Sequence, residues 1–569
     1  MRPAGARLEQ SPSSSRGVRP GSPCLRRAAT LAGLAVLGAG AGHQCLAQAT
    51  DALQSPAGDR LPAWTRNWSP LARVGDLPRT LPGGTVFPSL LTLPAPRVGI
   101  FWTAGNPAAL PFELEDERVE FRAGGMGMSG DYFRPLDPGR VTSSSVQAFG
   151  WRRLGDRGAA IGRFVVSRPS LQDSAFADVL DPYTSNPFLV LDTIGDPVRR
   201  LAARLEGATG WRFGRFALGL GLGYEGQETR TTVSPVPRVN RSAIPAVTGG
   251  IGYQTADGSF QVGAFARFKQ TTQFLQIVTI SQASRIFQLE GYEEPVPLDL
   301  QPAEFRRRFE RNAYAVGGAV GGRSGSATWT VFGQVEEVSE DQFTRTRANA
   351  PPKDRWDGNG WTAGGAFQWP LGPDRFLLTL NGRYTTLSGE ALRADIDAVV
   401  FTVDEDRLTT DLELRLLPVG GWQAAGRFHV VREVRDRRDL LAQASSSIRS
   451  WQGGAAVEVA RVLSGGFGLS VGGSLALYGP SGLIPRPEDR GPVFRRFVGP
   501  ELALDVTDAR EQAGQLTFRW QTAHQTGLWL RGQVGSLVPT GSSSAPLVPT
   551  GRRTGWNVSA GVVLGETWP

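Results

Sequence analysis

Residues 201–225 read LAARLEGATGWRFGRFALGLGLGYE, two alternating runs that meet at Gly214-Arg215. After this step every second residue is large and apolar, and the residues between are mostly glycine. Successive side chains of a strand point to opposite sides, so Leu218 and Leu220 would share one face while Gly219 lies on the other. The stretch therefore predicts a β-hairpin with one apolar wall and one wall of polar or small residues.

The same arrangement surrounds seven further short turns. The eight turns are Gly155-Asp156-Arg157-Gly158, Gly214-Arg215, Ala256-Asp257-Gly258, Gly322-Arg323-Ser324-Gly325, Leu371-Gly372-Pro373-Asp374, Val419-Gly420-Gly421, Ser464-Gly465-Gly466 and His524-Gln525-Thr526-Gly527. Longer polar stretches that contain proline separate successive hairpins. Short turns at one end of the strands and long loops at the other are typical of a transmembrane β-barrel.

Eight hairpins make sixteen strands over residues 141–537, and one further strand fits at each end, at about 117–131 and 553–566. The predicted fold is all-β: a transmembrane antiparallel outer-membrane β-barrel of about 18 strands, with short periplasmic turns and long outer loops. A soluble β-sandwich also alternates and is the alternative. The runs exceed the roughly five or six residues of soluble strands, and aromatic residues such as Trp211 and Phe216 gather beside the turns, where a membrane interface would lie.

The first 49 residues predict a signal sequence. A pair of arginines precedes an apolar run at residues 28–42, and a small-x-small pattern ends at Ala49. The run is shorter than the roughly 20 residues that a membrane-spanning helix needs. Both cysteines, Cys24 and Cys45, fall in this segment, so the remaining chain is expected to use neither disulfides nor thiolate metal sites.

The charge balance argues against a nucleic-acid partner. The net charge falls from +8 to +3 when the six arginines and one glutamate of residues 1–49 are removed. The remainder shows no basic cluster with interleaved aromatic residues, which nucleic-acid binding would require. We therefore expect no nucleic-acid binding.

Residues 50–116 are rich in proline and do not alternate. Proline removes donors from a strand ladder, so this segment is not expected in the barrel wall. It also carries large apolar residues such as Trp64 and Phe101, more than a solvated tail needs. One interpretation is a plug folded into the lumen, and the other is a disordered periplasmic lead. The predicted domains are the signal sequence (1–49), this segment, and the barrel (117–569).

Four motifs carry a resemblance to known families. They are Asn106-Pro107-Ala108, Ser129-Gly130-Asp131-Tyr132, Phe149-Gly150-Trp151-Arg152-Arg153 and the run from Asn186 to Asp196. Together they resemble a family of predicted outer-membrane β-barrel proteins of unknown function, over about residues 105–569. This resemblance implies the barrel but no activity. The Asn-Pro-Ala step alone is similar to the start of fatty-acid-transporter-like barrels, whose smaller barrel departs from the predicted strand count.

Catalytic and metal chemistry have little support. His429 and His524 are the histidines after residue 49, and no motif marks a serine nucleophile beside a base. No cluster of histidines or cysteines suggests a metal site. The acidic run Asp404-Glu405-Asp406 is expected in an outer loop, either solvated or as a weak calcium site. We expect the chain not to be an enzyme and to hold no cofactor.

Polar and charged residues assigned to the inward face are candidates for lining a pore. They are Arg204, Glu206, Glu225, Arg267, Lys269, Arg383, Asp411, Glu413, Arg415, Arg427, His429 and Glu458. A long outer loop is also expected at about Ile277–Arg311, with acidic residues followed by arginines. Such a loop either folds into the lumen and narrows it or lies solvated at the surface.

These features predict a channel or transporter for small polar solutes in the bacterial cell outer membrane. Basic side chains slightly outnumber acidic ones among the inward candidates, which predicts a modest preference for anions. The alternatives are a non-transporting scaffold or surface-binding barrel, and hydrophobic-ligand uptake like that of fatty-acid transporters. Expected partners are outer-membrane lipid, the barrel-assembly machinery and a small solute that the sequence does not identify.

Overall fold

The computed structural model describes residues 98–114, 117–177, 186–231, 238–278, 286–292, 296–297, 304–343, 354–372, 375–485, 491–522, 526–540 and 551–565. The predicted signal sequence and residues 50–97 lie outside this set. Each described segment below belongs to one compact unit of the chain.

Strands make up most of the described chain. They are β1 (Arg118–Gly130), β2 (Arg140–Leu154), β3 (Gly158–Ala177), β4 (Phe188–Phe213), β5 (Phe216–Thr231), β6 (Arg238–Gln254), β7 (Phe260–Val278), β8 (Ile286–Glu290), β9 (Val296–Pro297), β10 (Glu304–Ser324), β11 (Ala327–Phe343), β12 (Asp354–Leu371), β13 (Phe376–Arg393), β14 (Ala398–Val419), β15 (Trp422–Asp439), β16 (Ala444–Val462), β17 (Phe467–Leu483), β18 (Ala509–Gln521), β19 (Thr526–Pro539) and β20 (Arg553–Leu564). The helices are α3 (Ile100–Ala104), η3 (Pro107–Ala109), α4 (Leu110–Glu113), η4 (Ser464–Gly466), α5 (Pro492–Arg496) and α6 (Val498–Asp505).

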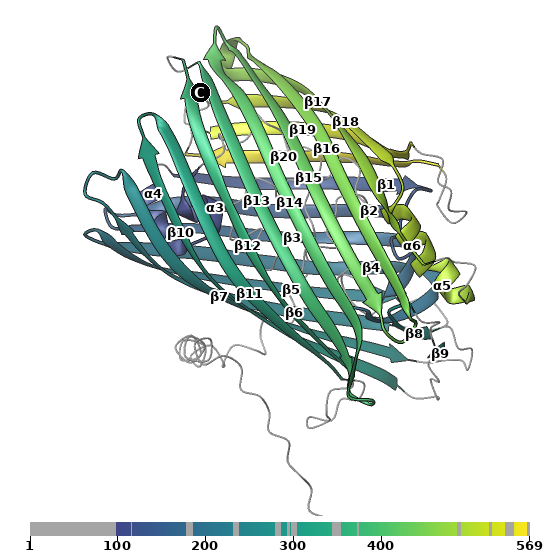
Figure 1. Ribbon diagram of the computed structural model, residues 1–569. Helices are drawn as coiled ribbons and strands as arrows, with labels where there is room; N and C mark the ends of the chain where they lie inside the picture. The colour runs from purple at the N-terminus through teal and green to yellow at the C-terminus, as the bar shows by residue number, and fades with distance from the viewer. Residues whose placement is uncertain are drawn as a thin grey trace, which may run out of the picture. The chain divides into compact units, whose positions relative to one another are not determined.

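Eighteen of these strands form a closed antiparallel barrel (Figure 1). Each pairs with its neighbours in chain order, except that β7 pairs directly with β10. The ring closes where β1 pairs with β20, from Val119 opposite Leu564 to Gly130 opposite Arg553. Strands β8 and β9 lie outside the ring and extend the outer end of β4. The predicted fold class and strand count are both confirmed.

The short turns lie where the sequence predicts them. Gly214, between β4 and β5, has φ 65°, a left-handed conformation that glycine adopts without the steric penalty of a Cβ. This explains why a hairpin loop of two residues carries glycine here. Pro373 and Asp374 of the fifth turn lie outside the described residues. The eighth turn is described only by its ends, because β18 stops at Gln521 and β19 begins at Thr526, and His524 lies outside the described residues. We call this end of the barrel the short-turn end and the opposite end the loop end.

The outer surface carries the apolar residues of each strand. Leu218, Leu220 and Leu222 on β5 are 54%, 42% and 56% exposed, whereas Ala217 between two exposed residues is 1% exposed. Exposed aromatic residues flank the short turns, among them Trp211, Phe213, Phe216, Trp369, Phe376, Trp422 and Phe467. An apolar outer band with an aromatic rim is the surface of a barrel that crosses a membrane. The helices of the described segments include none that is both long and apolar enough to cross one.

Two predicted outer loops are corrected by the structure. Strand β10 begins at Glu304, so the arginines at the end of the predicted Ile277–Arg311 loop belong to the barrel wall. The acidic run at 404–406 lies within β14. Both strands extend at the loop end, where polar residues occur on both faces. Apolar alternation therefore stops before the strand itself does, and the strand ends cannot be recognised from it.

Candidate functional site

The structure places all twelve predicted pore-lining residues on the inward face of the barrel. Most pair with charged neighbours on the same strand or on an adjacent one. The Nη2 atom of Arg427 lies 2.7 Å from the Asp411 carboxylate, and the Nη2 atom of Arg415 lies 3.0 Å from that of Glu413. The Nε atom of Arg204 donates to Glu206 at 2.7 Å. These pairs make the inner wall polar and largely charge-balanced.

Three further candidates contact the wall or the N-terminal segment. Glu458 accepts a hydrogen bond of 2.7 Å from Ser470. Arg267 donates to the carbonyl of Ala104, which precedes the Asn-Pro-Ala step, at 3.4 Å. Arg383 lies over the ring of Phe332, with its guanidinium carbon 5.7 Å from the ring centroid.

Sequence reasoning missed a second group of inward charges on β1, β3, β18 and β19. They are Arg118, Glu120, Arg122, Arg163, Arg519 and Arg531, each on the same face as the buried residues of its strand. The signal was present, because on β1 these charges alternate with Val119 and Phe121, which face outward. Arg118 lies over the ring of Trp151, a residue that also packs against the N-terminal segment.

Residues 98–114 pack inside the barrel at the short-turn end. Apolar side chains of α3 and α4 form a buried cluster with inward residues of the wall. The cluster includes Ile100, Phe101, Leu110, Leu114, Trp151, Ile161, Phe265 and Phe332. The carboxylate of Glu113 accepts hydrogen bonds from the backbone N–H of Phe101 at 3.1 and 3.2 Å, which ties the two short helices together.

Asn106 fixes this segment to the wall. Its Nδ2 atom donates to the carbonyls of Ile251 on β6 and Ala264 on β7, at 3.0 and 3.2 Å. Its Oδ1 atom accepts from the backbone N–H of Ala108 at 3.0 Å, which forms a turn closed by the side chain. Asn106 is fully buried, so these bonds are shielded from competing water.

Inward glycines provide the surface on which this turn rests. A Cβ atom added to Gly250 would overlap Oδ1 of Asn106, and one added to Gly219 would overlap the backbone of Ala108. Gly210 and Gly263 also lie directly against this turn. In these places the small-residue face makes room for protein backbone. The alternating pattern alone suggests a face that lines open water, but at these positions the face contacts protein.

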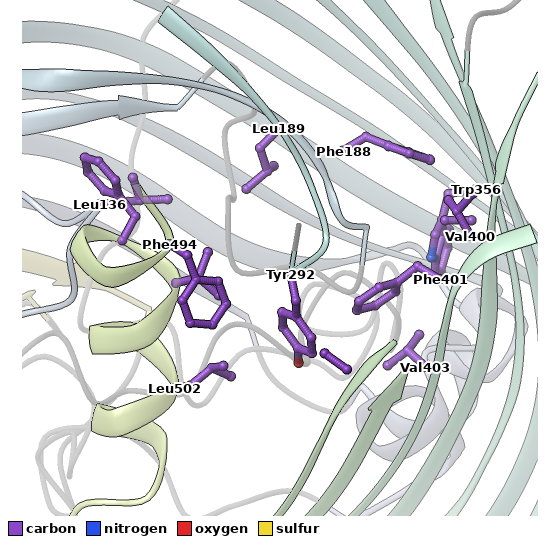
Figure 2. Close-up of a cluster of buried hydrophobic side chains, with 14 of the residues drawn as sticks. Leu136, Phe188, Leu189, Tyr292, Trp356, Val400, Phe401, Val403, Phe494 and Leu502 are labelled. Atoms are coloured by element: carbon purple, nitrogen blue, oxygen red, sulfur yellow. The ribbon is translucent and has the colours of Figure 1, made fainter. Parts of the chain in front are cut away.

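The loop end is filled by a second apolar cluster (Figure 2). Tyr292, from the chain between β8 and β9, is its central residue. Its ring centroid lies 5.7 Å from that of Phe401 on β14 and 6.3 Å from that of Phe494 on α5. Leu136, Phe188, Trp356, Phe497 and Leu502 complete the contacts around it. Of the two interpretations of the loop at Ile277–Arg311, the placement of Tyr292 favours the inward one for the part of the loop that the structure describes.

A network of ion pairs joins α6 to the wall at the same end. Asp505 lies 2.9 Å from Arg134, in the β1–β2 connection, and 3.1 Å from Arg435 on β15. Arg435 also contacts Glu405 at 2.9 Å and Glu433 at 2.6 Å. Glu405, the middle residue of the acidic run at 404–406, thus pairs with an arginine inside the barrel. The described residues contain no group of histidine, cysteine or acidic side chains that could hold a metal ion.

The carboxyl group of Glu501, on α6, has a raised pKa. Its Oε1 atom lies 3.6 Å from Nη1 of Arg134. Burial, with a contribution from the nearby Asp505, raises the pKa of Glu501 to about 7, against the opposing effect of Arg134. The network therefore contains one carboxyl group that changes its charge near neutral pH.

Comparisons with known proteins identify a family and several structurally similar barrels. A family model described as "Family of unknown function (DUF6850)" matches residues 107–564. The chain is similar to the copper transporter OprC, with a TM-score of 0.39 and 11% identity over 79% of this chain and 82% of that one. It is also similar to the unliganded ferric citrate transporter FecA (TM-score 0.38, 9% identity, 78% of both chains). The apoprotein of the FrpB iron transporter from Neisseria meningitidis has a TM-score of 0.37 and 10% identity, over 81% of this chain and 82% of its own. No curated protein matches the chain.

Proposed function

We propose that this chain, which belongs to the DUF6850 family of unknown function, is a bacterial outer-membrane channel or transporter for small polar solutes. In this proposal residues 98–114 close the short-turn end of the lumen, and the cluster around Tyr292 closes the loop end. A path through the barrel requires both of these closures to move. The protein acts without catalysis and without a cofactor, embedded in outer-membrane lipid after insertion by the barrel-assembly machinery.

The inner wall is the observation that carries this proposal. Side chains of the pair Arg427–Asp411 are 17% and 21% exposed, and those of Arg204 and Glu225 are 25% and 38% exposed, although all four point into the barrel. Close-packed protein interiors are mainly apolar, and ions buried there are costly. A charged wall that remains partly exposed inside a closed barrel fits a hydrated path between the two closures.

The inner wall also distinguishes the alternatives. A path for hydrophobic ligands needs an apolar inner wall, whereas the inward apolar residues here gather mainly in the two closures. A scaffold needs a stable exterior surface but no hydrated, charged lumen. The polar-solute interpretation therefore accounts for more of the described side chains than either alternative.

A disulfide lock tests the proposal. A Cβ atom added to Gly252 would lie 3.5 Å from Cβ of Ala108, within the range of roughly 3.5–4.5 Å that a disulfide spans. The double variant Ala108→Cys/Gly252→Cys, in planar bilayers, is expected to conduct less often when oxidised and to recover on reduction. The single-cysteine variants are the controls and should not respond to oxidation. Folded wild-type protein that neither conducts ions nor swells liposomes would favour the scaffold alternative.

A further inference from the structure

Two arginines share one indole ring on the inner wall. The guanidinium carbons of Arg122 on β1 and Arg531 on β19 lie 5.1 and 5.2 Å from the ring centroid of Trp529. Trp529 is buried and lies close against Gly561, where an added Cβ would be 2.6 Å from the indole. Cation–π contacts hold both guanidinium groups near one another at a defined place.

Further arginines lie within electrostatic range of this pair. Arg531 interacts with Arg519 as well as Arg122, and Arg519 interacts in turn with Arg118. Arg163 on β3 also interacts with Arg122. We call these five residues, Arg118, Arg122, Arg163, Arg519 and Arg531, the arginine strip.

Few carboxylates face the arginine strip. The carboxylate of Glu120 is shared, at 3.1 Å from Arg118 and 3.0 Å from Arg122. Glu206 lies 3.9 Å from Arg163 but also pairs with Arg204, outside the strip. Glu458 is the further acidic neighbour of Arg519 and Arg531, and it accepts a hydrogen bond from Ser470. Glu225 is a further acidic neighbour of Arg163, so four carboxylates lie near the five guanidinium groups. Two of the four, Glu206 and Glu225, also pair with Arg204.

Hydrogen-bonding side chains border the strip toward the loop end. Gln515, Gln533, Asn557 and Ser559 point inward from β18, β19 and β20, and each is partly exposed. The amides of Gln515 and Gln533 bond to one another at 2.9 Å. These four residues, with Arg122 and Arg519, form a partly exposed part of the inner wall, whereas Arg118, Arg163 and Arg531 are buried.

We propose that the arginine strip is a binding site for small solutes carrying an oxyanion group, a carboxylate or a phosphate. Guanidinium groups present paired N–H donors that match the two oxygens of such a group, and the neighbouring amides and hydroxyl can bind the rest of a polar solute. The proposal deepens the proposed function, because the bound oxyanion is the solute that the channel moves. Its binding step can still be measured without transport.

Inorganic phosphate is the probe for a direct binding test on the full-length protein in detergent. Titration calorimetry at constant ionic strength, with chloride as the replacement anion, should show saturable binding. The double variant Arg122→Gln/Arg531→Gln should weaken it about tenfold, since charge-assisted hydrogen bonds are lost. Arg122→Lys/Arg531→Lys should fall between, because the charge remains and the paired donors do not. Arg438→Gln, which removes an exposed arginine from the outward face of β15, is the matched control and should bind as wild type.

The outcomes separate this inference from the proposed function. Saturable phosphate binding that depends on Arg122 and Arg531 supports the site, even in a protein that never conducts. Conductance by a folded protein that shows no phosphate binding overturns the site and leaves the proposed function standing. Equal affinity in wild type and Arg122→Gln/Arg531→Gln, with folding verified by the thermal unfolding of each variant, also overturns it.

Discussion

Adjacent residues in the strands of this barrel meet opposite environments. Leu220 is exposed on the lipid-facing surface, and its neighbour Gly221 is buried on the inward face beside Thr248. The loss of folding stability caused by a substitution therefore depends on whether its position faces the lipid or the lumen. Two pairs of neighbouring residues allow this to be measured.

The first pair is Leu220 and Gly221. Leu220→Arg places a charge in hydrocarbon and should destabilise the barrel by about 2–4 kcal/mol. Gly221→Ser should be mild, because an added Cβ would lie 3.5 Å from Cβ of Thr248, an ordinary contact distance. Urea-dependent unfolding from lipid vesicles measures both. Equal losses would contradict the assigned faces.

The second pair is Gly249 and Gly250. Gly250→Ala should displace Asn106, because the added Cβ would overlap its Oδ1 atom. The loss of the Asn106 hydrogen bonds should lower the stability of the packed segment by about 1–3 kcal/mol, since polar groups are left unsatisfied. Gly249→Ala is the control, since nothing lies within 4 Å of a Cβ added there. Limited proteolysis of reconstituted protein should release residues 98–114 faster in Gly250→Ala than in Gly249→Ala. The same rate in both would argue against the anchoring role of Asn106.

Among the helices and loops, α6 depends on its contacts. It has eight residues and its N-cap residue makes no side-chain hydrogen bond, so the helix would be marginal alone. Its position is set by Leu502 in the apolar cluster and by Asp505 between two arginines. The place of α6 in the closure at the loop end therefore depends on these contacts.

Asp505→Asn tests the ionic part of that closure. The substitution leaves Arg134 and Arg435 buried with a missing negative charge, which should weaken the closure by about 3–5 kcal/mol. Hydrogen exchange of the backbone amides at 498–505 should become much faster. Asp508→Asn, at an exposed carboxylate three residues later, should leave that exchange unchanged. Unchanged exchange in Asp505→Asn would show that apolar packing alone holds the helix.

The pKa of Glu501 predicts how the closure depends on pH. The closed state keeps the Glu501 proton up to about pH 7, whereas a released α6 would lose it near the ordinary pKa of 4.5. The closed state therefore binds more protons in this window, so its stability is fully present below pH 4.5 and declines as the pH rises to about 7. Open probability in bilayers should be higher at pH 8 than at pH 5. Glu501→Gln should remove this difference, and a pH dependence that persists in Glu501→Gln would assign it to another group.

At the scale of the whole molecule, closure of the ring gives each of the eighteen strands one face toward the lumen and one face toward the outside. The β1–β20 pairing leaves no free edge between these two strands, which the membrane interior requires. It also places β1 next to β20, which is followed around the ring by β19 and β18, so that arginines distant in sequence face the same part of the lumen. The distribution of charge on the inner wall is thus a property of the closed ring.

That distribution predicts the ion preference of the open channel. The charges of the arginine strip and its neighbours are mixed, with arginines in slight excess, and such a wall attracts anions only weakly. Reversal potentials in a salt gradient should show modest anion selectivity, and Arg122→Gln/Arg531→Gln should reduce it. Arg438→Gln, which removes an exposed outward charge, should leave the reversal potential unchanged. Cation selectivity in the wild type would contradict the prediction.

The sequence by itself determined the strands, the short turns, the strand count and the lipid-facing surface. These follow from period-two alternation and from glycine at turns such as Gly214, both of which act between residues close in the chain. Most inward charges could be assigned for the same reason, and Arg118 and Arg122 on β1 obey the same rule.

Only the tertiary structure decided what the inward residues contact. An inward glycine has the same sequence signature whether it faces water or protein, and Gly250 meets Asn106 from 144 residues earlier in the chain. Asp505 meets Arg134 in the same way, 371 residues apart. Such pairings depend on ring closure and on the packing of loops inside the barrel. The local alternation of residues therefore does not predict them.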